Sequence, residues 1–284
     1  PSVTLCHILL DSLQKICLMH GIEVDYYKKL FQTAGNIIEL IEKDDIPKYL
    51  LFLENVFPYM DNYNYQKGMK EIIQELKNFL KPKDIGTDSD RALLLDFQAT
   101  LEIKPEKAIK LEKDALAQIE TITADNARLV SNLHANLGGL YRMNGYPDLA
   151  REHMEKSISL LDQFNLLHIN DSIPQIANYA MFLTEQQEPE RGISELQKLS
   201  GIIKEYHSDD CLDYAKVQET LGTIYLMTAN LPQAKTHFKR AFKIYEKIWA
   251  DEPEMIEAKY QEIQELYPQI GFCIGKNLSG LLTK

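Results

Sequence analysis

The sequence reads LGGLYRMNGYPDLAREHM at residues 137–154 and LGTIYLMTANLPQAKTHF at residues 221–238. These stretches lie 84 residues apart (221 − 137 = 84), which is twice 42. A single step of 42 from the first stretch reaches the same order of apolar and small residues at Tyr179-Ala180, Leu183, Gly192 and Leu196. Similarity at a fixed period of this size is the signature of a repeat protein, and it decides the fold.

Proline marks the start of one helix in each repeat. Pro105, Pro147 and Pro189 follow one another at intervals of 42 residues, and Pro232 comes 43 residues later. Proline suits the first helical position, because its missing N–H would have no partner within the helix. An acidic residue follows three of these prolines and would face the positive end of the helix dipole. The spacing therefore predicts four helix starts.

The residues between these markers follow a helical period. Apolar side chains recur at intervals of three and four at Val130, Leu133, Leu137 and Tyr141. Asn144-Gly145 is a turn signal, so the repeat unit is predicted to be helix–turn–helix. We expect Gly138 and Ala150 to let the two helices of a pair approach closely.

The order Leu-Gly-x-x-Tyr, then small, aromatic and Ala, resembles the tetratricopeptide repeat (TPR). Its best copy is Leu221-Gly222, Tyr225, Ala234, Phe238 and Ala241. The 42-residue period resembles the longer form found in kinesin light chains and in bacterial signalling proteins. This resemblance implies an all-α fold, a right-handed superhelix (α-solenoid) of TPR-like helix-turn-helix repeats.

The pattern divides the chain into three parts. Residues 88–250 are predicted to hold the 42-residue repeats, although Asp96 and Glu112 stand at positions that are usually small and apolar. Residues 1–87 are predicted to form degenerate TPR-like helical pairs, with two amphipathic helices at 3–43. A further degenerate repeat is suggested by Leu53, Phe57, Gly68 and Ile72. Residues 251–284 are predicted to be a capping helix at 253–267 and a tail.

Composition narrows the function. The formal net charge is −11 and the sequence shows no basic cluster, which argues against direct binding of nucleic acid. No apolar run approaches the ~20 residues that span a membrane. The four cysteines form no CxxC pair, which favours free thiols in a reducing compartment. The chain is therefore predicted to be cytoplasmic.

The sequence offers little catalytic chemistry. No histidine stands at metal-ligand spacing from a cysteine, so we predict no metal, no cofactor and no catalytic residue. His207 followed by Asp209-Asp210-Cys211 could suggest a base beside a nucleophile. A solvated loop that caps the next helix is the favoured interpretation.

The first helix of each pair should line the concave surface of a superhelix. The candidate groove residues are Asn132, Asn136, Arg142, Asn178, Met181, Glu185, Lys216 and Thr223. An asparagine amide both donates and accepts, so Asn136 and Asn178 could clamp an extended peptide backbone, as asparagines do in the resembling family. The alternative is that they brace neighbouring helices. Arg142 and Lys216 could meet acidic ligand groups.

The predicted function is a non-catalytic module that holds a protein or peptide segment in this groove. Because the chain begins at Pro1, we expect it to be part of a larger bacterial regulatory or signalling protein. The alternative is the C-terminal sensor arm of a signal-transducing NTPase or of a peptide-pheromone-type regulator. An enzyme is less favoured. The sequence makes no prediction of oligomeric state.

Overall fold

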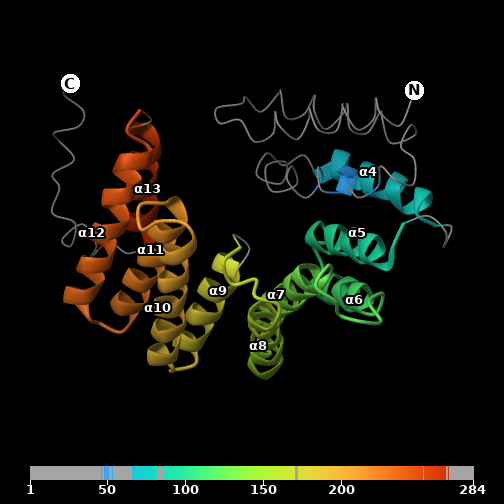
Figure 1. Ribbon diagram of the computed structural model, residues 1–284, viewed down its shortest axis with the longest axis horizontal. Helices are drawn as coiled ribbons and strands as arrows, with labels where there is room; N and C mark the ends of the chain where they lie inside the picture. Colours follow the sequence, from blue (N-terminus) through green and yellow to red (C-terminus); the bar gives the residue numbers. More distant parts are fainter. Residues whose placement is uncertain are drawn as a thin grey trace. The chain divides into compact units, whose positions relative to one another are not determined.

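The fold is helical throughout its described part (Figure 1). The computed structural model describes residues 46, 48–50, 53, 66–81, 86–169, 172–251, 253–266 and 268. The chain divides into two compact units, residues 1–146 and 147–284, and each is described by itself. The first contains α4 (Gln66–Phe79), α5 (Asp88–Thr100), α6 (Pro105–Leu116) and α7 (Ala127–Met143). The second contains α8 (Pro147–Gln163), α9 (Ser172–Glu185), α10 (Pro189–Tyr206), α11 (Leu212–Met227), α12 (Leu231–Ile248) and α13 (Pro253–Leu266).

The predicted all-α fold class is confirmed, and so are the predicted helix starts. Pro105, Pro147 and Pro189 are the first residues of α6, α8 and α10, and Pro232 is the second residue of α12. The predicted helices at 3–43, Phe57 of the degenerate repeat and the tail after residue 268 lie outside the described residues. The domain boundaries at residues 87 and 250 stay predictions.

The same turn follows three of the first helices. Gly145, Gln187 and Ala229 have φ angles of 77°, 65° and 58°, and each is 42 residues from the next. In each turn the following N–H bonds back to a carbonyl five residues earlier: Tyr146 to Tyr141, Glu188 to Leu183 and Asn230 to Tyr225, at 3.0, 2.8 and 2.7 Å. This left-handed termination satisfies carbonyls at the helix end. The predicted turn at Asn144-Gly145 is confirmed, although the later copies use residues with side chains.

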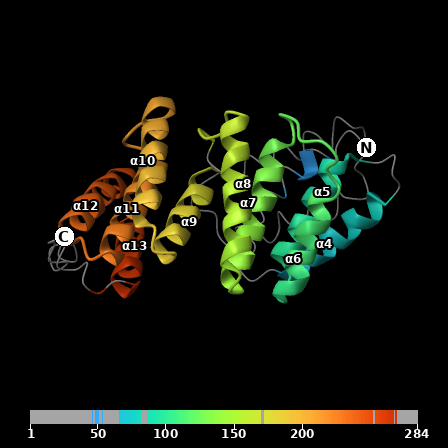
Figure 2. The same ribbon diagram turned by 90° about the horizontal axis from the view of Figure 1, so that it is seen from below.

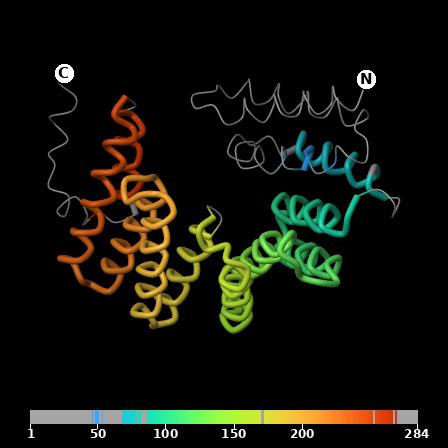
Figure 3. The backbone as a smooth tube through the Cα atoms, in the orientation of Figure 1, coloured from blue at the N-terminus to red at the C-terminus, as the bar shows by residue number. Residues whose placement is uncertain are grey.

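Small residues set the distance between paired helices in the second unit, where the tube view shows α9–α10 and α11–α12 as successive hairpins (Figure 3). A Cβ on Gly192 of α10 would lie 2.6 Å from the carbonyl oxygen of Ala180 in α9. A Cβ on Gly222 of α11 would lie 2.9 Å from the ring of Phe238 in α12. A larger residue at either glycine would therefore force the pair apart. Gly138 and Ala150 belong to different units, so their predicted contact stays a prediction.

The core of the second unit runs through α9 to α13, whose last four helices lie side by side in the view from below (Figure 2). Phe242 of α12 is 2% exposed and stacks on Tyr260 of α13, with ring centroids 4.1 Å apart. Lys259 of α13 lies 3.0 Å from Glu219 of α11. These contacts hold the predicted C-terminal helix on the repeats; its role as a cap stays a prediction.

The first unit has a smaller described core. Ala92 of α5, Ala115 of α6 and Leu133 of α7 meet in one buried cluster. Because two of these side chains are alanines, the three helices pack closely around the point of contact. Leu53 and Ile72 of the predicted degenerate repeat are also buried.

The left-handed turn supplies a stability test. Ala229→Gly should raise the free energy of unfolding by about 1 kcal/mol, because an L-residue at positive φ strains the backbone and glycine does not. Urea denaturation followed by the fluorescence of Trp249, the single tryptophan, measures the change. Gly201→Ala is the control of opposite design, since Gly201 is helical and a Cβ there would meet nothing within 4 Å. Gly201→Ala should also raise the free energy of unfolding. A destabilised Ala229→Gly variant would contradict this account of the turn.

Candidate functional site

The predicted groove residues of the second unit come from α9 and α11, which contact each other. We call Asn178, Met181, Glu185, Lys216 and Thr223 the α9–α11 face. Asn178, Glu185 and Lys216 are exposed, and Met181 and Thr223 are partly exposed. The structure thus brings two helices together with polar side chains accessible on both.

Two residues of this face already make contacts within the protein. The Thr223 hydroxyl donates to the Glu219 carbonyl at 3.1 Å, and Met181 packs against the core. Two others offer polar groups to a ligand. The exposed Lys216 lies 3.6 Å from the partly buried Asp213, and ion pairs at a protein surface are weak in water. Asn178 makes no side-chain hydrogen bond within the described part of the chain.

The predicted residues of the first unit lie on α7. Asn132 and Arg142 are partly buried and Asn136 is exposed. The Asn136 amide donates to Asp96 Oδ1 of α5 at 2.8 Å. Asn136 therefore braces two helices, which is the alternative that the sequence left open, while its role towards a ligand stays a prediction. Because Asn136 and Asn178 belong to different units, their expected position on one wall also stays a prediction.

Asn136 belongs to a polar cluster with the partly buried Asp96 and the buried Glu112. The Glu112 side chain of α6 is 2% exposed, and its Oε2 atom has no hydrogen-bond partner. Burial raises the pKa of the Glu112 carboxyl, the charge of Asp96 and a hydrogen bond to it raise it further, and a hydrogen bond from Asn136 opposes the rise. Asp96 and Glu112, the two residues that depart from the apolar repeat pattern, are thus in contact, and Glu112 is held as the neutral acid.

The favoured interpretation of residues 207–211 is wrong in one respect. Cys211 is the N-cap residue of α11, but no side chain caps the helix there. The carboxylates at 209 and 210 instead pair with Lys204 of α10 and Lys247 of α12. The two lysines come from the ends of two other helices, and the sequence pattern predicted neither ion pair.

The possible base and nucleophile have separate partners. His207 Nε2 donates to the His168 carbonyl at 2.9 Å, and Cys211 Sγ donates to the Ser208 carbonyl at 3.2 Å.

No group of potential metal ligands occurs among the described residues. The absence of enzymatic activity nevertheless stays a prediction. No helix in the described ranges is long and apolar enough to cross a bilayer.

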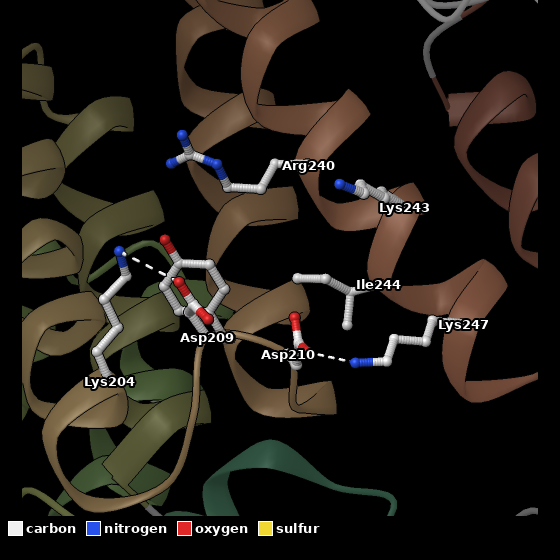
Figure 4. A pocket seen from close by; sticks show the side chains of 8 residues that line it. Lys204, Asp209, Asp210, Arg240, Lys243, Ile244 and Lys247 are labelled. Carbon is white, nitrogen blue, oxygen red and sulfur yellow. Dashed lines mark hydrogen bonds and ion pairs between the residues drawn. The ribbon is translucent and has the colours of Figure 1, made fainter.

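Sequence reasoning missed a pocket of about 240 Å³ between α10, α12 and the loop before α11 (Figure 4). Lys204, Arg240, Lys243 and Lys247 contribute its positive charge. The sequence did carry a signal: three of these cations lie at 240, 243 and 247, which are on one side of a helix. The overall acidity of the chain concealed it.

The model of the tetratricopeptide repeat family matches residues 172–247. Residues 172–247 are tetratricopeptide repeats. They extend from the start of α9 almost to the end of α12. Because the match does not establish repeat length, the 42-residue period stays a prediction.

Several solved structures share the fold. BtubC (BKLC) from P. vanneervenii is 18% identical, with a TM-score of 0.53, over 65% of this chain and 72% of that chain. A putative kinesin light chain from Podosopora anserina with TPR-like repeats is 14% identical, with a TM-score of 0.53, over 69% and 96%. A Rap protein complexed with Competence and Sporulation Factor is 15% identical, with a TM-score of 0.52, over 94% and 76%. No curated protein matches the sequence.

At these identities the likeness to solved structures concerns the fold alone. TPR domains form soluble helical scaffolds for protein–protein interaction, generally without catalysis. The TPR match therefore implies an interaction scaffold built on helix pairs, and the fold itself names no partner.

The bracing role of Asn136 predicts unequal effects of two similar substitutions. Asn136→Ala should lower the free energy of unfolding by about 1–2 kcal/mol, because Asp96 loses its amide donor. Asn178→Ala should change it by less than about 0.5 kcal/mol. Urea denaturation followed by circular dichroism measures both. Equal losses would show that the Asn136–Asp96 hydrogen bond does not distinguish the two asparagines.

The buried Glu112 predicts a dependence of stability on pH. Its folded pKa is raised above the usual 4.5, so its contribution to stability is complete below that value and is lost as the pH rises towards the folded pKa. Glu112→Gln removes the titration. It should be more stable than the parent by roughly 1–3 kcal/mol at about pH 8, with a smaller difference at about pH 5.

Urea denaturation at the two pH values gives the comparison. Glu106→Gln, an exposed change on the same helix, is the matched control and should follow the parent at both. If Glu112→Gln and the parent respond to pH in parallel, Glu112 is not held neutral in the folded state.

Proposed function

We propose that the α9–α11 face binds an extended segment of a partner protein or a peptide, without catalysis. The observation that carries the proposal is the exposed amide of Asn178 on α9, which has no side-chain hydrogen bond among the described residues, on a helix that contacts the one presenting Lys216. An amide can pair with both the N–H and the C=O of a bound backbone. Lys216 can attract an acidic group of the ligand, because its present partner Asp213 lies 3.6 Å away.

A regulatory role in a larger bacterial signalling protein is the finer form of this proposal. It draws support from the Rap protein complexed with Competence and Sporulation Factor, whose likeness extends over 94% of this chain. In this form of the proposal, the chain is a cytoplasmic regulator that senses a ligand of comparable kind. The same observation supports the alternative of a pheromone-type sensor arm more than an NTPase arm.

Selection from a displayed library of random peptides tests the binding function with purified protein. We expect enriched peptides to bind the parent chain and to lose at least about tenfold in affinity with Asn178→Ala/Lys216→Ala. The reason is that each lost hydrogen bond from a desolvated ligand group weakens binding by about 1 kcal/mol or more. Isothermal titration calorimetry with a synthetic copy of an enriched peptide measures the change.

Gln197→Ala/Lys198→Ala is the matched control. It removes one amide and one ammonium from exposed positions of α10, the second helix of the pair. Enriched peptides that bind both double variants as tightly as the parent would remove the α9–α11 face from consideration. So would a library that yields no peptide specific for the parent.

A further inference from the structure

The pocket beside α12 carries more positive charge than its surroundings neutralise. Four cationic and two anionic side chains line it, which leaves a net charge of +2 in a chain whose formal charge is −11. Arg240, Lys243 and Lys247 descend one side of α12, and Lys204 comes from the last turn of α10. Figure 4 shows Lys204 directed at Asp209 and Lys247 directed at Asp210, with Arg240 and Lys243 on the α12 side of the pocket.

The two carboxylates offset only part of the positive charge of the pocket. Asp209 lies 3.8 Å from Lys204, and Asp210 pairs with Lys247. Lys243 forms no hydrogen bond or ion pair within the described residues. Among the described residues, the Arg240 guanidinium donates a single long hydrogen bond of 3.4 Å, to Gln218 Oε1. A guanidinium and an ammonium thus line the pocket from positions three residues apart on α12.

The walls of the pocket are suited to holding an anion. Tyr214 is 3% exposed and lies beneath the Lys204 ammonium, 5.2 Å from ring centroid to Nζ. Ile244 is also buried. Such walls lower the local dielectric constant and strengthen the attraction between the cations and a bound anion. The carboxylates of the existing pairs are more than half exposed, so they can turn into water at little cost when a stronger anion arrives.

We propose that this pocket binds a phosphate monoester, either a small molecule or the phosphorylated side chain of a protein. A phosphate monoester carries close to two negative charges at neutral pH and three acceptor oxygens. That charge matches the net charge of +2 on the lining side chains, whereas a single carboxylate would only repeat what Asp209 and Asp210 already provide. The volume of about 240 Å³ is below the range of sites for drug-sized ligands, which favours a phosphoryl group over a whole cofactor.

The pocket is separate from the α9–α11 face. Tyr214 and Lys216 are two residues apart on α11, and therefore point about 200° apart around the helix. Substitutions in the pocket can thus be tested without changing the residues proposed to bind a peptide. The proposal that the pocket binds phosphate does not depend on whether the α9–α11 face binds a peptide.

Isothermal titration calorimetry of the full chain with phenyl phosphate tests the proposal. Phenyl sulfate is the matched ligand, because it has a similar shape and one negative charge. We expect phenyl phosphate to bind with a Kd of roughly millimolar or tighter, and phenyl sulfate to bind at least about tenfold more weakly. The absence of binding by phenyl phosphate in the millimolar range would overturn the proposal, as would equal affinity for the two ligands.

Variants of α12 locate the site. Arg240→Gln/Lys243→Gln should weaken phenyl phosphate binding at least about tenfold. Lys235→Gln/Lys239→Gln makes the same change in charge at exposed positions of the same helix outside the pocket, and should retain it. Asp210→Asn should tighten binding, because it removes a competing carboxylate. Equal losses in both double variants would indicate a diffuse charge effect and would overturn the assignment to the pocket.

The source of the phosphate is settled by two further titrants. A phosphoserine peptide that binds much more tightly than phenyl phosphate, while its unphosphorylated form does not bind, supports a phosphorylated protein side chain. Equal affinity of phosphoserine peptide and phenyl phosphate supports a small molecule. Binding of a single-stranded oligonucleotide without any binding of phenyl phosphate would overturn the proposal in favour of phosphodiesters.

Discussion

The close approach of the two helices in each pair is the constraint on which the second unit depends. Gly192 faces the backbone of Ala180, and Gly222 faces the ring of Phe238, at distances that leave no room for a side chain. Helices this close bury their facing sides almost completely, as Ala180, Leu221 and Phe238 show. The buried side of each first helix is therefore used for packing, and its remaining side is left for other contacts.

The turn geometry follows from the same constraint. Two antiparallel helices in contact need a short connection, and within the second unit the left-handed residue at 187 or 229 ends one helix within a few residues of the next start. The repeated bond across each turn keeps the carbonyls at the helix end satisfied. Repetition of one turn gives successive pairs the same local geometry, which is how α9 and α11 of the second unit come to lie in contact.

Local sequence signals predicted helices well, because their causes are local. Pro105 and Pro189 mark helix starts through chemistry that requires no distant partner. The turn at Ala229 was harder to recognise, because alanine, unlike glycine, is not a residue type that signals positive φ. The repeat pattern could not predict side-chain contacts, because they join residues far apart in the sequence. Asn136, for example, donates to Asp96, 40 positions away. The cationic pocket likewise joins Lys204 to Lys247 across two helices and a loop.

The central claim is that the α9–α11 face holds a partner protein. Site-specific photo-crosslinking in the cells that make the protein tests this claim directly. A photoreactive p-benzoylphenylalanine replaces either Asn178 on the first helix or Gln197 on the second helix of the same pair; both positions are exposed. The account predicts that light joins a distinct partner to the chain from position 178 and not from position 197. Crosslinks from 197 alone, or from neither position, would contradict it.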